Sequence, residues 1–427
     1  MKIFIHDLRT KFLLPIALLG LAANGLSAAD FAQWRGPLRD GHSPETGLLQ
    51  EWPKGGPKLL WQVTNVTEGF STPSVVGERI YLLGNEGAEE SVLALNAKDG
   101  SRVWAGKLGK VGHPEQKPSY PGARSTPTVD GKFLFALGSD GDLVCLDIAN
   151  GKEVWRKHLR TDFGGNYGEW AYSESPLVDG DKVIVTPGGT NATLIALNKK
   201  TGDVIWKCGV PEGSAAGYSS VIIAEFSGVK QYVQFLTSGL MGVDVQSGKL
   251  LWRYEKSGRG SPAAIITPLV SDGMIYSGAF RATTALVKPV LKDGAFTVEE
   301  IYSIGKLPVG LGGVLKVGDY FYGSGNAAAM CVEFKTGAVK WEERSIGAGS
   351  LLVADKRIYV HAESGDVALI EPSGDSYREK GHFTPPGLPS RANPMEKAWT
   401  YPVIANGKLY IRDKESLWCY DVKMERR

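Results

Sequence analysis

The 427-residue sequence holds few residues of the kinds that carry covalent, redox or metal chemistry. It has 4 cysteines and 6 histidines, and one histidine, His6, lies in the N-terminal leader. It contains no GxSxG nucleophile motif, no HExxH zinc motif and no glycine-rich phosphate loop. The other five histidines are widely scattered, so a zinc cluster has no local support. No metal site and no catalytic residue is therefore expected.

An excess of charge of one sign is lacking too. The chain carries 48 basic and 46 acidic residues, a formal net charge of +2. Removing the leader takes away three basic residues and one acidic residue, which leaves 45 of each. Phosphate binding relies on a basic surface, so nucleic acid is not an expected partner. Beyond the leader no segment is apolar enough to cross a bilayer.

The first 29 residues are typical of a secretory signal. Basic residues precede an apolar run over 12–23, and small residues lead up to Asp30, which favours cleavage near Ala29. A membrane anchor is the alternative, but the run is interrupted by Pro15 and is shorter than the ~20 residues needed to span a bilayer. No cysteine follows the cleavage site, so there is no sign of lipid attachment. We expect an exported protein, periplasmic or extracellular, with a signal peptide over 1–29, a Pro/Gly-rich arm over 30–58 and one repeat domain over 59–427.

The rest of the chain is built from copies of one unit. Residues 71–104 read STPSVVGERIYLLGNEGAEESVLALNAKDGSRVW and residues 125–155 read STPTVDGKFLFALGSDGDLVCLDIANGKEVW. Six further copies begin near residues 174, 219, 267, 312, 350 and 401. The aromatic residues that end the units recur at Trp104, Trp155, Trp206, Trp252, Tyr302 and Trp341. This period is close to the ~40–50 residues of propeller blades.

Each unit predicts four short antiparallel strands joined by Gly/Asn turns. The middle strands are apolar on both faces, so each small sheet must be covered on both sides, as in sheets stacked radially. The eighth copy stops near 421–422 without its tryptophan strand, whereas residues 57–63, PKLLWQV, are such a strand alone. Joining the two leaves no open edge. The sequence predicts an all-β, eight-bladed β-propeller whose last blade is closed by the N-terminal strand; seven blades would require one copy to be an insertion.

The repeat also explains most of the cysteines. Three of the four fall at one position of the unit, which requires a small residue and holds Ala94, Cys145, Ala196, Gly242, Cys331, Ala368 and Cys419 in successive copies. Residues at equivalent places in different blades are too far apart for a disulfide. The fourth, Cys208, has no matching partner, so free structural thiols are expected.

Units of the form ALDxxTGxxxW resemble those of PQQ-like β-propeller proteins. That family includes pyrroloquinoline-quinone alcohol dehydrogenases and a non-enzymatic (BamB-like) lipoprotein of the outer-membrane barrel-assembly machinery. The segments 34–61 (WRGPLRDGHSPETGLLQEWPKGGPKLLW) and 172–189 (YSESPLVDGDKVIVTPGG) are similar to those of an exported bacterial group of these proteins. Two features depart from the pattern: residues 307–313 read LPVGLGG where that group usually has a His-His pair, and the adjacent cysteines of the quinone enzymes are absent.

Candidate binding residues lie in the long links that join each tryptophan to the next copy, all on one face. Aromatic rings beside arginine and glutamate suit a peptide, a sugar or a flat cofactor, although such residues also cap a propeller by packing on one another. The candidates are Tyr120, Arg124, Tyr167, Trp170, Tyr172, Glu174, Tyr218 and Arg259. Ser139-Asp140-Gly141-Asp142 suggests a calcium loop, but Glu363-Ser364-Gly365-Asp366 recurs at the same hairpin, so a turn is favoured.

Three functions compete. The first is a non-enzymatic exported propeller that binds a protein or carbohydrate on its long-loop face, with no cofactor. The second, which the resemblance implies, is a calcium- and PQQ-dependent alcohol or sugar dehydrogenase, with the quinone stacked on rings such as Trp170 and held by Arg124 or Arg259. The third is a subunit that assembles outer-membrane proteins. The sequence leaves the ligand and the oligomeric state open.

Overall fold

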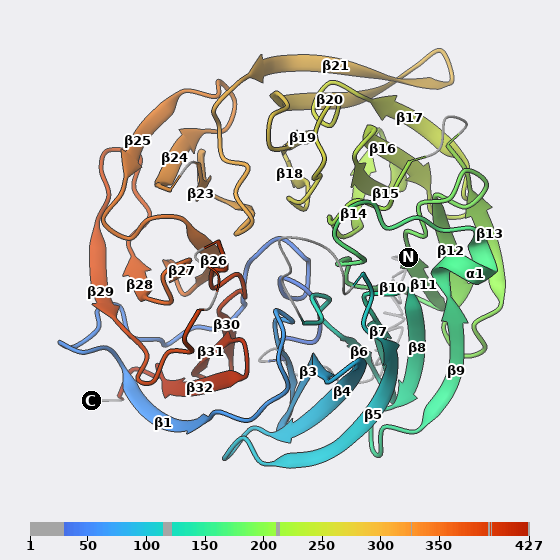
Figure 1. Ribbon diagram of the computed structural model, residues 1–427. Helices are drawn as coiled ribbons and strands as arrows, with labels where there is room; N and C mark the ends of the chain where they lie inside the picture. Colours follow the sequence, from blue (N-terminus) through green and yellow to red (C-terminus); the bar gives the residue numbers. More distant parts are fainter. Residues whose placement is uncertain are drawn as a thin grey trace, which may run out of the picture.

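Eight antiparallel sheets of four strands stand around one axis, so the predicted eight-bladed propeller is confirmed (Figure 1). The computed structural model describes residues 30–113, 122–210, 214–325, 327–391, 393 and 395–425. The first strand of each blade lies nearest the axis and the fourth lies at the rim (Figure 1). The signal peptide predicted over 1–29 lies outside the described residues.

Blades 1 to 4 follow the chain without a crossover. Their strands are β2 (Ser74–Val76), β3 (Arg79–Glu86), β4 (Glu89–Asn96), β5 (Arg102–Lys110); β6 (Thr128–Asp130), β7 (Phe133–Leu137), β8 (Asp142–Asp147), β9 (Glu153–His158); β10 (Leu177–Asp179), β11 (Lys182–Val185), β12 (Leu194–Asn198), β13 (Val204–Cys208); and β14 (Ile222–Phe226), β15 (Val229–Leu236), β16 (Gly239–Asp244), β17 (Leu250–Tyr254). A short helix, α1 (Leu159–Phe163), follows β9. Within the described ranges, no helix is long and apolar enough to cross a membrane.

Blades 5 to 8 complete the ring, and the last is built from both ends of the chain. Their strands are β18 (Leu269–Ser271), β19 (Met274–Gly278), β20 (Thr284–Lys292), β21 (Ala295–Ile304); β22 (Val314–Val317), β23 (Tyr320–Ser324), β24 (Ala329–Glu333), β25 (Val339–Glu343); β26 (Gly349–Ala354), β27 (Arg357–Ala362), β28 (Val367–Ile370), β29 (Glu379–Phe383); and β30 (Val403–Ala405), β31 (Lys408–Asp413), β32 (Ser416–Asp421), β1 (Lys58–Val63). In blade 8, β1 pairs with β32 and brings Trp61 opposite Cys419. The predicted closure by the N-terminal strand is therefore confirmed.

The small position of the unit faces the rim tryptophan of the same blade. The facing pairs are Ala94 with Trp104, Cys145 with Trp155, Ala196 with Trp206, Gly242 with Trp252 and Cys331 with Trp341. At Gly242 an added Cβ would lie 2.2 Å from the indole of Trp252, so this copy of the position has no room for a side chain. All four cysteines are buried and free, as expected for structural thiols.

The tryptophans also join neighbouring blades. The indole N–H of Trp104, in blade 1, donates to the carbonyl of Ile148, in blade 2, at 3.0 Å, and Trp155 donates to Lys199 of blade 3 at 2.9 Å. Gly151, in the turn beside Ile148, has a φ of 70°, and a Cβ there would lie 2.5 Å from the ring of Trp104. The Gly-Trp spacing of the unit thus encodes the contact between blades, because only glycine leaves room for the ring and adopts this backbone conformation readily.

The arm enters the ring and lies along its axis, where its dark blue trace is visible in Figure 1. Phe31 is fully buried and exchanges two backbone hydrogen bonds with Val75, at 2.7 and 2.9 Å. Further hydrogen bonds join the arm to blades 5 and 7: Trp34 Nε1 to Thr267 Oγ1 at 3.1 Å and Ser43 N to Val353 O at 2.8 Å. The arm therefore cross-braces inner strands that do not touch one another.

Candidate functional site

The links from each rim strand to the next inner strand lie on one face of the ring, together with the turns between second and third strands. We call this the long-loop face, and the opposite face, which carries the other two turns of each blade, the short-turn face. This arrangement follows from the strand order, because the strands of every blade alternate in direction. The face predicted from the sequence to bind a ligand is the long-loop face.

Link 159–176, between blades 2 and 3, holds an aromatic group. Tyr172 is buried, and its hydroxyl donates to the carbonyl of Pro187 in blade 3 at 2.8 Å. Tyr167 is half-buried and meets Tyr172 edge-on, with ring centroids 5.4 Å apart. The guanidinium of Arg160, in α1, lies 4.9 Å from the centre of the Tyr167 ring. Tyr172 thus forms the base of the group, whereas Tyr167 and Arg160 reach the surface.

A second aromatic pair joins this link to the next. The hydroxyl of Tyr218 accepts the backbone N–H groups of Glu169 at 3.0 Å and Trp170 at 2.9 Å. The rings of Trp170 and Tyr218 meet nearly edge to face, with centroids 5.8 Å apart and an interplanar angle of 63°. Both side chains are half-buried. This pair fixes the position of the Trp170 ring on the long-loop face.

Arg124 lies in the link that leads into blade 2. Burial lowers the pKa of its guanidinium, and the nearby charges of Glu90 and Tyr218 oppose that shift, so Arg124 lies within electrostatic reach of both. Glu90 is fully buried and accepts hydrogen bonds from the backbone N–H and hydroxyl of Ser139 at 2.8 and 2.6 Å. Burial raises the pKa of Glu90 to about 7. The positive charge of Arg124 thus acts on both Glu90 and Tyr218.

Glu174 lies beneath the surface. It is 1% exposed, and its carboxylate accepts the backbone N–H of Thr186 at 2.7 Å and the hydroxyl of Thr186 at 2.9 Å. Burial raises its pKa to about 7 against these hydrogen bonds and the field of Arg39. In this arrangement Glu174 supports the link from below and presents no oxygen to a ligand.

One predicted residue cannot be placed and another does not join the group. Tyr120 lies outside the described residues. Arg259 lies in the link between blades 4 and 5, where its side chain is 76% exposed and pairs with Glu255 at 2.5 Å. None of the contacts found among the described residues joins Arg259 to Trp170 or Arg124. The structure therefore brings together Arg124, Tyr167, Trp170, Tyr172 and Tyr218, with Glu174 beneath them.

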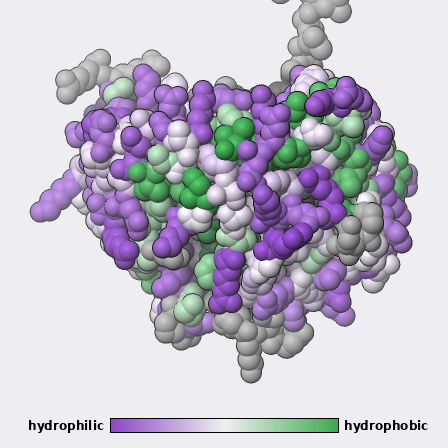
Figure 2. Space-filling model, turned by 90° about the horizontal axis from the view of Figure 1, so that it is seen from above, coloured by the Kyte–Doolittle hydropathy of each residue, from purple (hydrophilic) through white to green (hydrophobic). Residues whose placement is uncertain are grey.

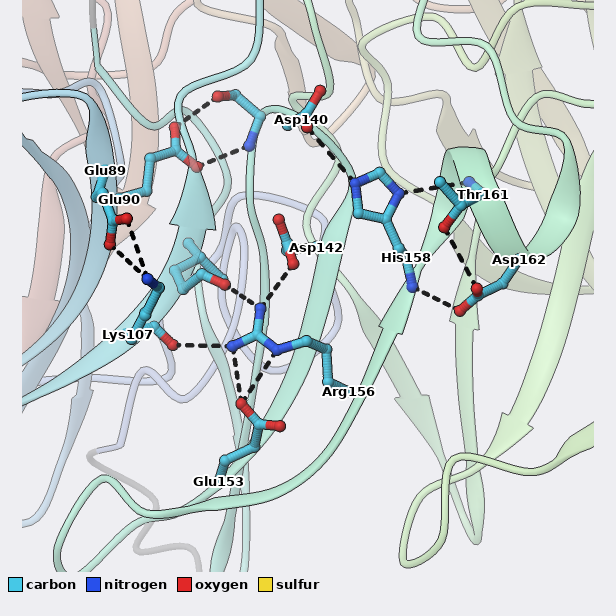
Figure 3. Close-up of polar contacts among 12 residues, drawn as sticks. Glu89, Glu90, Lys107, Asp140, Asp142, Glu153, Arg156, His158, Thr161 and Asp162 are labelled. Atoms are coloured by element: carbon cyan, nitrogen blue, oxygen red, sulfur yellow. Dashed lines mark hydrogen bonds and ion pairs between the residues drawn. The ribbon is translucent and has the colours of Figure 1, made fainter.

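A polar cluster borders this aromatic group (Figure 3). Asp140, Asp142 and His158 offer ligand atoms within 4.8 Å of one another. Each carboxylate already has an arginine partner: Asp140 pairs with Arg160 at 2.6 Å and Asp142 with Arg156 at 2.7 Å. Calcium takes six to eight oxygen ligands, so two arginine-paired carboxylates and an imidazole do not fit it.

Part of this cluster was predictable from the sequence. Asp140 and Asp142 belong to the predicted hairpin turn, which is confirmed by the hydrogen bond from Gly138 N to Asp142 O at 2.8 Å. Arg160 becomes a neighbour of the turn only when α1 folds back from the end of β9, whereas His158 lies opposite Asp142 in the same ladder that pairs Cys145 with Trp155. Gly164 ends α1 with a φ of 65°, which turns the link toward blade 3.

The fold and the repeats define an eight-bladed propeller of PQQ-like repeats. A family model described as "Outer membrane protein assembly factor BamB" matches residues 45–115 and 108–343. The chain belongs to this family. The BamB of Kangiella koreensis is 23% identical over 215 residues, which cover 49% of this chain and 48% of that protein. The chain thus spans about half the length of this relative.

Solved structures agree on the architecture. BamB from Moraxella catarrhalis matches with a TM-score of 0.56 and 16% identity, covering 86% of this chain and 98% of that one. The quinohemoprotein alcohol dehydrogenase of Comamonas testosteroni matches with a TM-score of 0.50 and 12% identity, covering 95% of this chain and 82% of that one. At these identities the likeness shows a shared fold.

Family and fold are compatible with a quinone, but the described candidate residues do not form a cradle for one. A flat cofactor stacks on an open ring face, whereas one face of Tyr167 is covered by Arg160. Arg259, predicted as a clamp, is paired with Glu255 in another link. The arrangement suits recognition by rings and arginine at a surface rather than enclosure of a cofactor.

Proposed function

We propose that this protein is an exported, non-catalytic scaffold that binds a protein partner on its long-loop face. The observation that carries the proposal is the pair of half-buried rings of Tyr167 and Trp170, with the exposed guanidinium of Arg160 over Tyr167, held by the ring contacts to Tyr172 and Tyr218. Tryptophan, tyrosine and arginine dominate the residues that contribute most to protein–protein binding. Membership of a family described by outer membrane protein assembly supports a protein partner as well.

A carbohydrate is the less favoured ligand. Sugars stack on exposed ring faces, and here Arg160 covers one face of Tyr167. At blade 5 the rim offers no competing surface, because its hydrophobic residues form separate small groups among hydrophilic ones (Figure 2). We therefore assign the partner to the long-loop face.

Site-specific cross-linking tests the proposal. A photo-reactive amino acid replaces Trp170 or, as a control, Val103, which is 44% exposed on rim strand β5. In cells that export the protein, we expect one protein adduct at position 170, identified by mass spectrometry, and none at position 103. Adducts of the same identity and yield at both positions, or none at 170, would contradict the proposal.

The captured partner then allows a quantitative test with purified proteins. Trp170→Ala and Arg160→Ala should each weaken binding at least about tenfold, or ~1.4 kcal/mol. Arg259→Ala is the matched control: it is an exposed arginine of the same face that pairs only within its own link, and we expect an effect below about twofold. Equal losses for Arg160→Ala and Arg259→Ala would argue against a defined site.

The finer proposal is that the partner belongs to an outer-membrane assembly machine, as the names of relatives suggest. Identification of the adduct at position 170 as a component of such a machine would support it, and a partner unrelated to the outer membrane would contradict it.

The quinone dehydrogenase alternative has its own test. Addition of PQQ with calcium should leave the absorbance and thermal stability unchanged, whereas a quinone-dependent spectrum with dye-linked alcohol oxidation would establish the enzyme.

A further inference from the structure

The short-turn face carries a cavity that is separate from the aromatic group. It has a volume of about 640 Å³, within the range of small-molecule sites. One wall is the arm, over 30–44, and the other is formed by the inner strands of blades 2 and 3 with their turns. The cavity is thus the part of the axis that the arm leaves unfilled, and it opens away from the long-loop face.

The arm holds an apolar side chain out into this cavity. Leu38 is 80% exposed and lines the cavity with Pro37, facing Val129 and Val178 of the blades. Its neighbour Arg39 is buried, which fixes the tip of the arm. The guanidinium of Arg39 donates to the carbonyl oxygens of Ser175 at 2.7 Å and Pro176 at 2.9 Å, at the start of β10.

The turn itself is tight. Gly36 has a φ of 87°, and a Cβ there would lie 2.5 Å from the carbonyl oxygen of His42. The backbone also bonds across the turn, from Gly41 N to Arg35 O at 3.0 Å. Leu38 is therefore held in place by the turn and by Arg39, although its own side chain stabilises nothing in the fold. A leucine preorganised in this way provides an apolar surface for a ligand.

The charges of the cavity are mostly negative. Its lining holds Asp30, Asp40 and Asp130 against one lysine, Lys199. Asp130 pairs with Lys199 at 2.5 Å, and Asp40 lies 3.4 Å from the imidazole of His42. Both of these aspartates are more than a third exposed, on opposite walls. A free amino group on Asp30 after leader removal would still leave an excess of negative charge.

We infer that this cavity binds an amphipathic cation, an apolar body with one ammonium or guanidinium group. The apolar part packs on Leu38, Val129 and Val178, and the cationic group lies between the carboxylates of Asp40 and Asp130. The same charges disfavour pyrroloquinoline quinone, which is a tricarboxylate. The site is independent of the partner proposed for the opposite face.

A matched pair of fluorescent probes tests the inference. Dansylcadaverine carries an ammonium group, and dansyl-6-aminohexanoate carries a carboxylate on a similar chain. With the purified exported protein at low ionic strength, we expect the emission of dansylcadaverine to shift to the blue on binding, and the carboxylate probe to bind at least about tenfold more weakly. Equal binding of the two probes, or none of the ammonium probe, would overturn the inference.

Variants at Leu38 test whether the probes bind in this cavity. Leu38→Ser should weaken binding of dansylcadaverine at least about fivefold, through lost apolar contact. Met395→Ser, a change of an exposed apolar residue on the long-loop face, should leave it within about twofold. Leu38→Lys places a positive charge in the cavity and should weaken binding of the ammonium probe while strengthening that of the carboxylate probe, two changes of opposite sign that misfolding cannot imitate. Unchanged preference in Leu38→Lys would show that the probes bind elsewhere.

Discussion

Glu174→Gln should change the way stability depends on pH. The native carboxyl group has a pKa of about 7, raised from its ordinary value of 4.5 by burial. Because the native pKa is raised, the protonated form is favoured by folding, and this contribution is fully present below about pH 4.5 and lost as the pH rises through about 7. At ~1.4 kcal/mol per pH unit, ionisation of Glu174 costs the native protein about 3 kcal/mol.

The glutamine variant lacks this titration. Between about pH 5 and pH 8, the free energy of unfolding of the wild type should therefore fall by about 2.5 kcal/mol relative to that of Glu174→Gln. Urea unfolding followed by tryptophan fluorescence, at steps across this range, measures the difference. Other carboxylates titrate in both proteins and cancel in the comparison.

Two further variants serve as controls for the pH dependence of the free energy of unfolding. Glu90→Gln should show the same pH dependence as Glu174→Gln, because burial raises the pKa of Glu90 to about 7 as well. Glu86→Gln should show a small dependence of opposite sign, since a hydrogen bond from Arg102 lowers the pKa of Glu86 at the surface. If the difference in the free energy of unfolding between the wild type and Glu174→Gln did not change with pH, the raised pKa of Glu174 would be refuted.

Three further predictions concern the ring. Arg39→Leu should lower the free energy of unfolding by about 3 kcal/mol, because two buried carbonyl groups lose their donor; an unchanged urea midpoint would show that the arm does not brace the axis. The thiols should resist Ellman's reagent in the native protein and react on unfolding, since burial raises the pKa of Cys145 to about 12; rapid labelling in native buffer would contradict this. Trp61→Phe should destabilise the protein by about 1 kcal/mol, as it removes the indole N–H that closing strand β1 donates to the carbonyl of Ala97 in blade 1 at 3.3 Å; an unchanged melting temperature would show that this contact of the closing strand contributes little.

The repeats made the ring predictable, and local spacing explains why. The small position, the turn glycine and the rim tryptophan of one unit lie close in sequence, so the pairing of Cys145 with Trp155 and the turn at Gly151 could both be inferred. Closure of the ring was also predictable, because an isolated tryptophan strand at one end complements a blade missing that strand at the other.

The path of the arm was not predictable from these patterns. Arg35 donates to the carbonyl of Val314, 279 residues away, and Arg39 donates to Ser175, 136 residues away. No periodicity marks such partners, because they meet only once the ring has brought their blades around the axis. The cavity beside Leu38 follows from this path, which is why only the long-loop face could be predicted from the sequence as a binding surface.

The candidate site was partly predictable. Tyr167, Trp170 and Tyr218 were identified by residue type and by their place in long links, and the structure brings their links together. Glu174 lies in the same polar link, yet its side chain is buried, and its carboxylate accepts a hydrogen bond from the backbone N–H of Thr186. Residue type identifies a polar link, but only packing decides which of its side chains remain at the surface.

The shared last blade makes synthesis and folding depend on each other. β1 leaves the ribosome early, but its partner, β32 (Ser416–Asp421), is made almost last. Until then β1 has an unpaired edge, and a chain that stops before residue 416 keeps that edge permanently. Unpaired edges invite aggregation, so a chain shortened in this way should be prone to associate through β1. Ring closure therefore makes the pairing of the first strand of the chain depend on the last one.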